Sequence, residues 1–358
     1  MNRRMDRMAP GAALLAAAVL LGGCERPPVE STQIGYRGVA MEQVQNPRTV
    51  AAKRAANVLP VVSPPVPAGG PTAGSVYKNV QVLGDLSAGE FARTMVAITA
   101  WVAPPGQSCA YCHAAGDLAS DSLYTKVVAR RMLQMVREIN GNWHVHVGET
   151  GVTCYTCHRG NAVPAYVWFD DAGQPHASQM AGNNAGKNAP SAVAGLTSLP
   201  RDPYGRFLGN ATNPSIRVVS TQPLAQSGVG VSIKDAEASY GLMIAMSESL
   251  GVNCTFCHNT RSFTDWTTST PQRVTAYHGL QMVRALNVNF LEPLATTLPA
   301  YRHGPRGDGP KLDCMTCHQG VYKPLFGQSL LKGYPALMAH PAAAVPPAVP
   351  PATGAPAQ

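Results

Sequence analysis

Eight of the nine cysteines fall into four C-x-x-C pairs, and a histidine directly follows each pair. In c-type attachment, two such thiols form thioethers with the haem vinyl groups and the adjacent histidine binds the iron. A lone pair could instead belong to a zinc site, a redox centre or a disulfide. Four complete motifs argue against these alternatives, since zinc needs a second ligand pair nearby and thiol redox chemistry needs no following histidine. The predicted thioether sites are Cys109, Cys112, Cys154, Cys157, Cys254, Cys257, Cys314 and Cys317, and the predicted proximal iron ligands are His113, His158, His258 and His318.

The sixth ligand of each iron decides between electron transfer and catalysis. An open position suggests chemistry on a small molecule, whereas methionine or a second histidine closes the site and suits an electron carrier. A methionine on an apolar stripe is more often core filler than ligand. Met95 and Met243 differ, because they recur at matching places ahead of the first and third motifs. We therefore expect both to bind iron.

For the second haem, Met132 and Met135 are both candidates, because they lie on the same face of a predicted helix. The segment LQMVR at 133–137 recurs at 280–284, so that Met135 matches Met282 and Met132 matches Gly279. If Met132 is the ligand, the fourth haem has lost its equivalent methionine and must take a ligand from elsewhere.

Six histidines remain as candidates for that missing ligand. Two of them, His144 and His146, lie just beyond the second predicted helix, where packing of the two halves could bring one to the fourth iron. Spacing alone does not choose between them, and a surplus histidine is usually a surface or propionate-bonding residue. The six are His144, His146, His176, His278, His303 and His340.

Helices upstream of the motifs must position these ligands. Capping signals open three of them, at Ser87–Glu90, Ser232–Asp235 and Thr270–Pro271. An apolar stripe marks the remaining one, formed by Val128, Met132, Met135, Val136 and Ile139. We expect a mainly α multihaem cytochrome c with two pseudo-repeated helix–haem–helix–haem halves and long irregular connecting segments.

The N-terminus predicts export and a lipid anchor. Three arginines precede an apolar run over 9–21, and this run ends in the lipoprotein-like sequence LGGC at Cys24. The run is too short for a permanent span, and no later segment is long and apolar enough to cross a bilayer. An ordinary signal peptide with an incidental cysteine is the alternative.

Composition and motif spacing divide the chain into successive segments. Proline-rich sequence indicates an extended N-terminal arm, the glycine- and asparagine-rich connector has one possible short strand at 216–220, and the Ala/Pro tail has a disordered composition. We expect a signal peptide at 1–23, a lipid-anchored arm at 24–75, a first dihaem half at 76–160, a connector at 161–231, a second dihaem half at 232–335 and a tail at 336–358.

The basic balance of the chain does not indicate nucleic-acid binding. The formal net charge of +8 falls to +6 in the mature chain, because residues 1–23 carry three Arg and one Asp. Four haems bring about eight propionates, which need Arg and Lys partners. Much of the positive surplus is therefore expected inside the protein.

Longer segments make the sequence resemble the tetrahaem cytochrome subunit of the photosynthetic reaction centre of purple bacteria. The resemblance covers nearly the whole mature chain and rests on VARRMLQM, TGVTCYTCHRG, NCTFCHN, STPQR and CHQGVYKPLFG. It implies three haems with His/Met ligands and one with two histidines. By motif, the methionine ligands fall on Met95, Met132 and Met243, and the distal histidine of the fourth haem falls on His146.

The resemblance also implies a role. Such a subunit lies on the periplasmic face of the photosynthetic membrane and is not an enzyme. It takes electrons from a soluble cytochrome c or a high-potential iron–sulfur protein and re-reduces the photo-oxidised bacteriochlorophyll pair. The third haem would lie nearest the membrane and the first haem at the distal end. Arg273 matches an arginine that lies between the third haem and the pair. Binding to a haem propionate is the alternative role for this side chain.

Two other classes of function compete with this interpretation. A multihaem oxidoreductase would have a substrate-binding haem with a five-coordinate, high-spin signal, and the helix-borne methionines argue against it. A light-independent periplasmic electron shuttle would share the haems but lack the longer segments quoted above.

Overall fold

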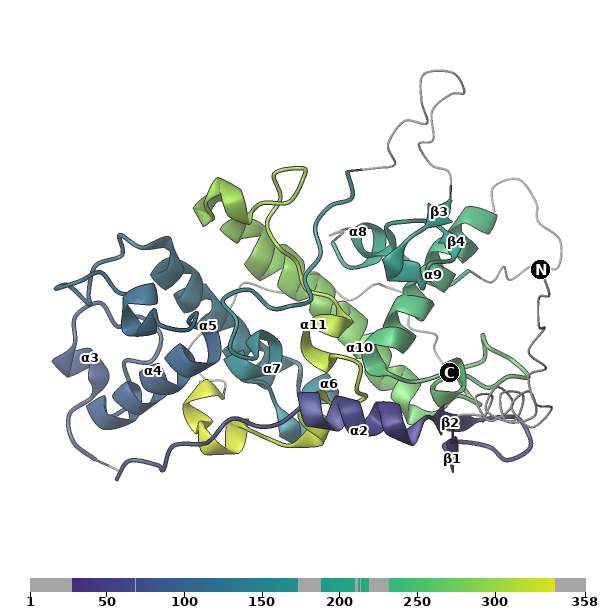
Figure 1. Cartoon of the computed structure of the whole chain (residues 1–358), viewed down its shortest axis with the longest axis horizontal. Coiled ribbons are helices and arrows are strands. Elements are labelled where there is room, and N and C mark those ends of the chain that lie inside the picture. Colours follow the sequence, from purple (N-terminus) through teal and green to yellow (C-terminus); the bar gives the residue numbers. More distant parts are fainter. Residues whose placement is uncertain are drawn as a thin grey trace, which may run out of the picture.

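The computed structural model describes residues 28–67, 69–172, 188–209, 212, 214–218 and 232–338. Helices dominate this part of the chain, as the sequence predicts, and Figure 1 shows an elongated molecule. The longer helices are α4 (Ala88–Val102), α5 (Tyr124–Asn142), α9 (Ile233–Leu250) and α10 (Pro271–Leu286). The shorter ones are α2 (Pro47–Ala56), α3 (Ala73–Val76), α6 (His144–Val147), α7 (Cys154–His158), α8 (Pro203–Phe207) and α11 (Cys314–His318).

Single turns and short strands connect these helices. The turns are η1 (Ser108–Tyr111), η2 (Gly148–Thr150), η3 (Ala192–Ala194), η4 (Cys254–Phe256), the π-helical η5 (Asn287–Leu291), η6 (Glu292–Thr297), η7 (Ala300–Arg302), η8 (Pro324–Gly327), η9 (Leu331–Gly333) and η10 (Pro335–Leu337). Two antiparallel pairs are formed by β1 (Glu30–Gln33) with β2 (Glu42–Gln45) and by β3 (Ala189–Pro190) with β4 (Ser198–Leu199).

The helix starts follow their capping signals. Ser87 accepts a hydrogen bond from the backbone N–H of Glu90 at the start of α4, and Ser232 forms a reciprocal capping box with Asp235 at the start of α9. Thr270 differs, because its hydroxyl donates to the Phe256 carbonyl (2.7 Å) instead of capping α10. The start of α10 is thereby bonded to the third haem motif.

The N-terminal arm contains more regular structure than its proline content predicts. Residues 30–45 form the β1–β2 hairpin, and α2 follows directly, with the Asn46 side chain accepting from Arg48 N–H and Pro47 in the first turn. Figure 1 places this hairpin at one end of the molecule and α3 and α4 at the other. The arm therefore runs along the long axis of the molecule.

In the connector, where the sequence offers a possible short strand at 216–220, residues 216–218 are irregular and residues 219–220 lie outside the described residues. The hydroxyl of Ser239 on α9 donates to the Ile216 carbonyl (3.0 Å), so a helix side chain bonds the backbone there.

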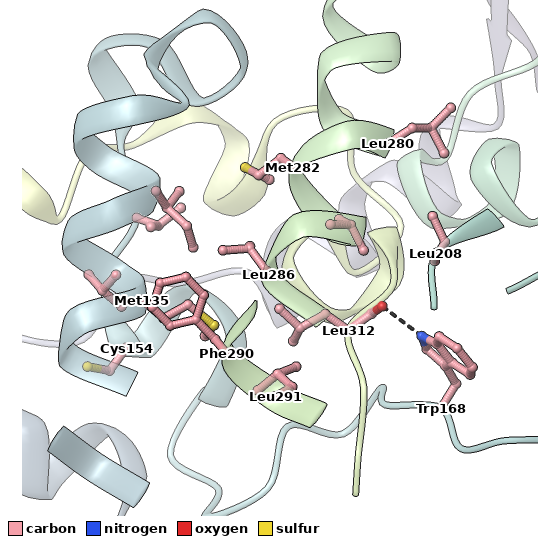
Figure 2. Packing of buried hydrophobic residues seen from close by; sticks show 14 of the residues in the cluster. Met135, Cys154, Trp168, Leu208, Leu280, Met282, Leu286, Phe290, Leu291 and Leu312 are labelled. Carbon is pink, nitrogen blue, oxygen red and sulfur yellow. Dashed lines mark hydrogen bonds between the residues drawn. The ribbon is translucent and has the colours of Figure 1, made fainter. Parts of the chain in front are cut away.

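The main apolar core lies between α5 and α10. Met135 on α5 faces Leu286 and Phe290 from the other half, and all three are buried (Figure 2). The Trp168 indole N–H donates to the Leu312 carbonyl (2.7 Å) at the edge of this core. Within the described ranges, no helix has the length and apolar character that crossing a bilayer requires.

Candidate haem sites

The four attachment motifs adopt two local conformations. The first and third form the 3-10 turns η1 and η4, each followed by a tight β-bridge, Ala114 to Asp117 and Asn259 to Ser262. The second and fourth form the short helices α7 and α11, each opened by a capping box. The boxes pair Thr153 with Thr156 and Asp313 with Thr316.

The predicted proximal histidines all use the same ring nitrogen for hydrogen bonding. Each Nδ1 lies at hydrogen-bond distance from a backbone carbonyl a few residues downstream, while Nε2 has no partner among the described residues. A carbonyl bonded to Nδ1–H fixes the tautomer that leaves Nε2 free for a metal. The pairs are His113 with Leu118 (2.9 Å), His158 with Asn161 (2.8 Å), His258 with Phe263 (2.8 Å) and His318 with Val321 (3.1 Å).

The electrostatics of these sites suit neutral ligands. Burial lowers the pKa of His158 and His258, and burial together with nearby His146 lowers the pKa of His318 to about 4. A neutral imidazole is the form that binds iron. Burial also raises the pKa of Cys154 and Cys314 to about 12, which keeps these thiols protonated.

The predicted methionine ligands lie on the expected helices. Met95 on α4, Met132 on α5 and Met243 on α9 are half-buried and pack against the core. Met132 and Met135 both line the same cavity as Cys157 and His158. The structure therefore brings both candidates to the second motif.

One large cavity joins the motifs. Its volume is about 600 Å³, and its walls are mostly apolar side chains of α5 and α10. Eight cysteines and histidines from the four motifs line it, which are Cys112, Cys154, Cys157, His158, Cys257, Cys314, Cys317 and His318. The second and fourth motifs meet in its wall, where the Sγ atoms of Cys157 and Cys317 lie 2.7 Å apart.

His146 reaches the fourth motif from the other half of the chain. Its ring centroid lies 6.1 Å from that of His318, with an interplanar angle of 67°. Its Nδ1 lies 2.9 Å from the Thr275 carbonyl on α10, which matches the arrangement of the proximal histidines. A Cβ on Gly279 would lie 2.5 Å from Cε1 of His146. The glycine that replaces the repeat equivalent of Met132 is thus the residue that makes room for this ring.

The other surplus histidines lack these features. His144 is exposed, and its Nε2 lies 3.2 Å from Oε1 of Glu149. His303 uses Nε2 to contact the Ala295 carbonyl (2.9 Å), and His278 packs its ring against Tyr277. His176 and His340 lie outside the described residues, as does Cys24.

Two buried asparagines that sequence reasoning missed hold the second and fourth motifs in place. Asn140 donates to the Val152 carbonyl (2.9 Å) and accepts from the Val152 N–H (2.8 Å), two residues before Cys154. Asn287 accepts from the Leu312 N–H (2.7 Å) and donates to the Leu312 carbonyl (2.9 Å), two residues before Cys314. Both follow the LQMVR segment at the same interval, so a longer repeat comparison could have found them.

Arg273 lies beside the third motif. Its Nη1 donates to the Asp265 carbonyl and to Oγ of Ser269, both at 2.6 Å, and its guanidinium lies 4.1 Å from the centre of the Trp266 ring. Burial raises the pKa of Cys257 to about 11 despite the positive charge of Arg273. The guanidinium is therefore close enough to act electrostatically on this site.

The residues present fit a c-type haem. The sites combine paired cysteine thiols, histidines with a free Nε2 and an apolar cavity, which are the donors and surroundings that such a group needs. A cation suited to an anionic propionate is also present, because Nη1 of Arg159 is buried without a hydrogen-bond partner among the described residues.

Known proteins resemble this chain over most of its length. Residues 25–338 match the family model described as photosynthetic reaction centre cytochrome C subunit. The chain is 51% identical over 335 residues to the photosynthetic reaction center cytochrome c subunit of Rubrivivax gelatinosus, covering 94% of this chain and 90% of that protein. It is 52% identical over 327 residues to the same subunit of Thermochromatium tepidum, covering 91% and 79%. With the Roseobacter denitrificans subunit the identity is 40% over 343 residues, covering 91% and 90%.

Proposed function

The chain belongs to the family of photosynthetic reaction centre cytochrome c subunits, and from this premise we propose that it re-reduces the photo-oxidised bacteriochlorophyll pair through four c-type haems. It carries c-type haem and associates with the reaction centre and its membrane. It is an electron-transfer protein and not an enzyme. When bound, each haem supplies a one-electron site, and the chain's own residues set its ligands, its orientation and its exposure to water.

The ligand set is part of the proposal. His113 with Met95, His158 with Met132 and His258 with Met243 would hold the first three irons, and His318 with His146 the fourth. The shared Nδ1–carbonyl geometry of all five histidines supports these roles. Thioether sulfur favours ferrous iron more than imidazole does, so the fourth haem should have a lower potential than its neighbours for equal surroundings.

The arrangement of the motifs carries the proposal of sequential electron transfer. η1 packs against α4 at one end of the molecule, and η4 packs against β2 at the other end (Figure 1). The second and fourth motifs lie between them and contact each other through Cys157 and Cys317. An electron entering at the first haem would therefore move through the second and fourth to the third, in short steps instead of one long one.

The remaining parts of the proposal concern organisation and location. α4 packs against α7 as α9 packs against α11, which supports two dihaem halves, 76–160 and 232–335, joined by the connector at 161–231. Lipid on Cys24 would hold the mature chain at the periplasmic face, with the tail at 336–358 beyond the second half. The electrons would come from a soluble cytochrome c or a high-potential iron–sulfur protein at the first haem, and Arg273 would act on the third haem from its place beside Cys257.

A light flash tests the function directly. In membranes with all haems reduced, a flash that oxidises the pair should be followed by haem oxidation at a rate independent of protein concentration, because donor and acceptor share one complex. The measurement is flash-induced absorbance change in the haem α-band. Membranes with a photoactive pair and no haem oxidation would instead support the light-independent shuttle.

A matched pair of variants on α9 sharpens this test. Met243→Leu should slow the flash-induced oxidation, because loss of the sixth ligand changes both the potential and the reorganisation of the third haem. Met246→Leu, one turn further along the same helix, should leave the rate unchanged although Met246 also packs against the core. Equal rates in both variants would remove Met243 from the ligand set.

A further inference from the structure

The turn before the third attachment motif is bonded to the N-terminal arm. This turn runs from Gly251, at the C-terminal end of α9, to Cys254, and strand β2 lies beside it. The contacts join residues about two hundred positions apart in the sequence. They are Gln43 Nε2 to Gly251 O (3.2 Å), Asn253 N to Gln43 Oε1 (3.1 Å), Val44 N to Asn253 Oδ1 (3.1 Å), Asn253 Nδ2 to Glu42 O (2.6 Å) and Thr255 Oγ1 to Glu42 O (2.7 Å).

Gln43 is the central residue of this contact. It is only 6% exposed, and its amide donates to one backbone group of the turn and accepts from another. Buried polar groups need hydrogen-bond partners. A side chain at this position that cannot donate leaves the Gly251 carbonyl unpaired, and one that cannot accept leaves the Asn253 N–H unpaired. No other residue type of this length offers both a donor and an acceptor at its end.

The turn joins the two elements that hold the third haem. α9 carries Met243, and η4 begins at Cys254 and leads directly to Cys257 and His258. Gly251 adopts a left-handed conformation (φ 64°), and the backbone reverses there between helix and motif. Bonds from Gln43 to both sides of this reversal fix the angle between the distal ligand and the attachment site.

The first motif lacks this support. It shares the other features of the third motif, including a threonine of the following helix that donates into it, Thr125 to the Tyr111 carbonyl (2.5 Å). Within the described residues, however, no strand bonds to the turn before Cys109. The contact with β2 therefore distinguishes the third haem site from its repeat equivalent.

We propose that Gln43 is a positioning residue that makes the membrane-proximal arm and the third haem site one rigid unit, a role that rests on the function proposed above. Because β2 begins 18 residues after Cys24, the same strand that follows the anchor also sets the orientation of the haem next to the acceptor. Electron transfer over a fixed gap depends on such an orientation.

Substitutions of Gln43 test this proposal in the full haem-bearing complex. Gln43→Leu should increase hydrogen exchange of the amides at 251–257 by about tenfold or more, since two buried hydrogen bonds to the turn are lost. It should also slow the flash-induced oxidation of the third haem at unchanged haem content. Gln43→Glu keeps the acceptor for Asn253 and loses the donor, so its effect should be intermediate.

Gln45→Leu is the matched control, because Gln45 lies on the same strand and makes no side-chain hydrogen bond to the turn within the described residues. Its exchange and kinetics should be those of the wild type. If Gln43→Leu does not accumulate with four haems, Thr255→Val removes a single donor at constant shape and should raise exchange at the same amides.

Unchanged exchange in the Gln43 variants, or an equal increase in Gln45→Leu, would overturn the proposal. The exchange measurement needs no light, so it stays decisive whatever the flash experiment shows. A wild type without flash-induced haem oxidation would refute the proposed function, whereas flexible Gln43 variants with wild-type kinetics would refute only the positioning role.

Discussion

A histidine that binds iron through Nε2 usually donates its Nδ1–H to another group, and this feature separates the proposed ligands from the surplus histidines. His146 meets it through the Thr275 carbonyl and lies against His318. His144, two residues earlier, commits Nε2 to Glu149 and stays exposed. The difference comes from α6, which directs one ring toward α10 and the other toward solvent.

Replacing His146 by methionine should raise the potential of the fourth haem. A thioether ligand favours ferrous iron, and axial ligands together move haem potentials over about 0.8 V, so a change on the order of 100 mV is expected. A redox titration that resolves the four haems measures it. His144→Met is the control and should leave all four potentials unchanged, and a shift there with none in His146→Met would reverse the assignment.

Residue-scale prediction from the sequence reaches furthest where chemistry is local. The motifs predict four proximal ligands, because the cysteines and the histidine of each motif lie within five residues. The choice between His144 and His146 could not be made from spacing, since it depends on a carbonyl more than a hundred residues away. Gly279 was a further indication, because the absence of a side chain at this position leaves room for the ring of His146.

At the scale of elements, buried asparagines connect each second helix to the motif that follows it. Asn140 satisfies both backbone groups of Val152 and also donates to the Leu337 carbonyl (2.8 Å). Asn287 makes the equivalent contacts to Leu312. These side chains replace strand pairing as the means of holding an extended segment in a helical protein.

Asn140→Leu should therefore destabilise the first half. Three buried hydrogen bonds are lost and the Val152 groups stay unpaired, so the thermal midpoint of the detergent-solubilised complex should fall by roughly 5–10 °C. Circular dichroism in the far ultraviolet measures the transition. Asn142→Leu makes the same change at an exposed position of α5 and should move the midpoint by much less. Similar losses in both variants would contradict the role of Asn140.

The sequence predicts elements well when their signals are local, and poorly when a distant partner decides. Caps at Ser87 and Ser232 place α4 and α9 correctly. The β1–β2 hairpin was not predicted, because β2 is stabilised by the turn at Asn253, about two hundred residues away. The irregular backbone at 216–218 has the same origin, since the hydroxyl of Ser239 on α9 bonds it.

At the scale of the whole molecule, the arm passes the haem motifs in the reverse order of the proposed electron path. Proceeding from β2 toward α3, it bonds the third motif through the Glu42 carbonyl, which accepts from Thr255 Oγ1. Lys53 then lies beside Gly320, two residues after the fourth motif, and Asn57 accepts from Arg159, the residue after the second motif. It then reaches α4, where Arg93 donates to the Ser63 carbonyl (2.7 Å). Among the described elements of the arm, the hairpin that follows Cys24 in the sequence is thus the one that contacts the third site.

This polarity leads to a prediction for the anchor. In cells that lack the other reaction-centre subunits, the wild-type chain should fractionate with membranes, and mass spectrometry should find an acylated N-terminal Cys24. Cys24→Ser should carry the same four haems but fractionate with soluble proteins, because the variant lacks the acyl chains whose burial in the bilayer supplies membrane affinity. Haem count by mass is the control for folding, since attachment needs all four motifs intact. If the variant stays in the membrane with four haems, or if the wild-type terminus is unmodified, the anchor lies elsewhere, and the orientation of the third haem toward the membrane would then depend on the protein interface alone.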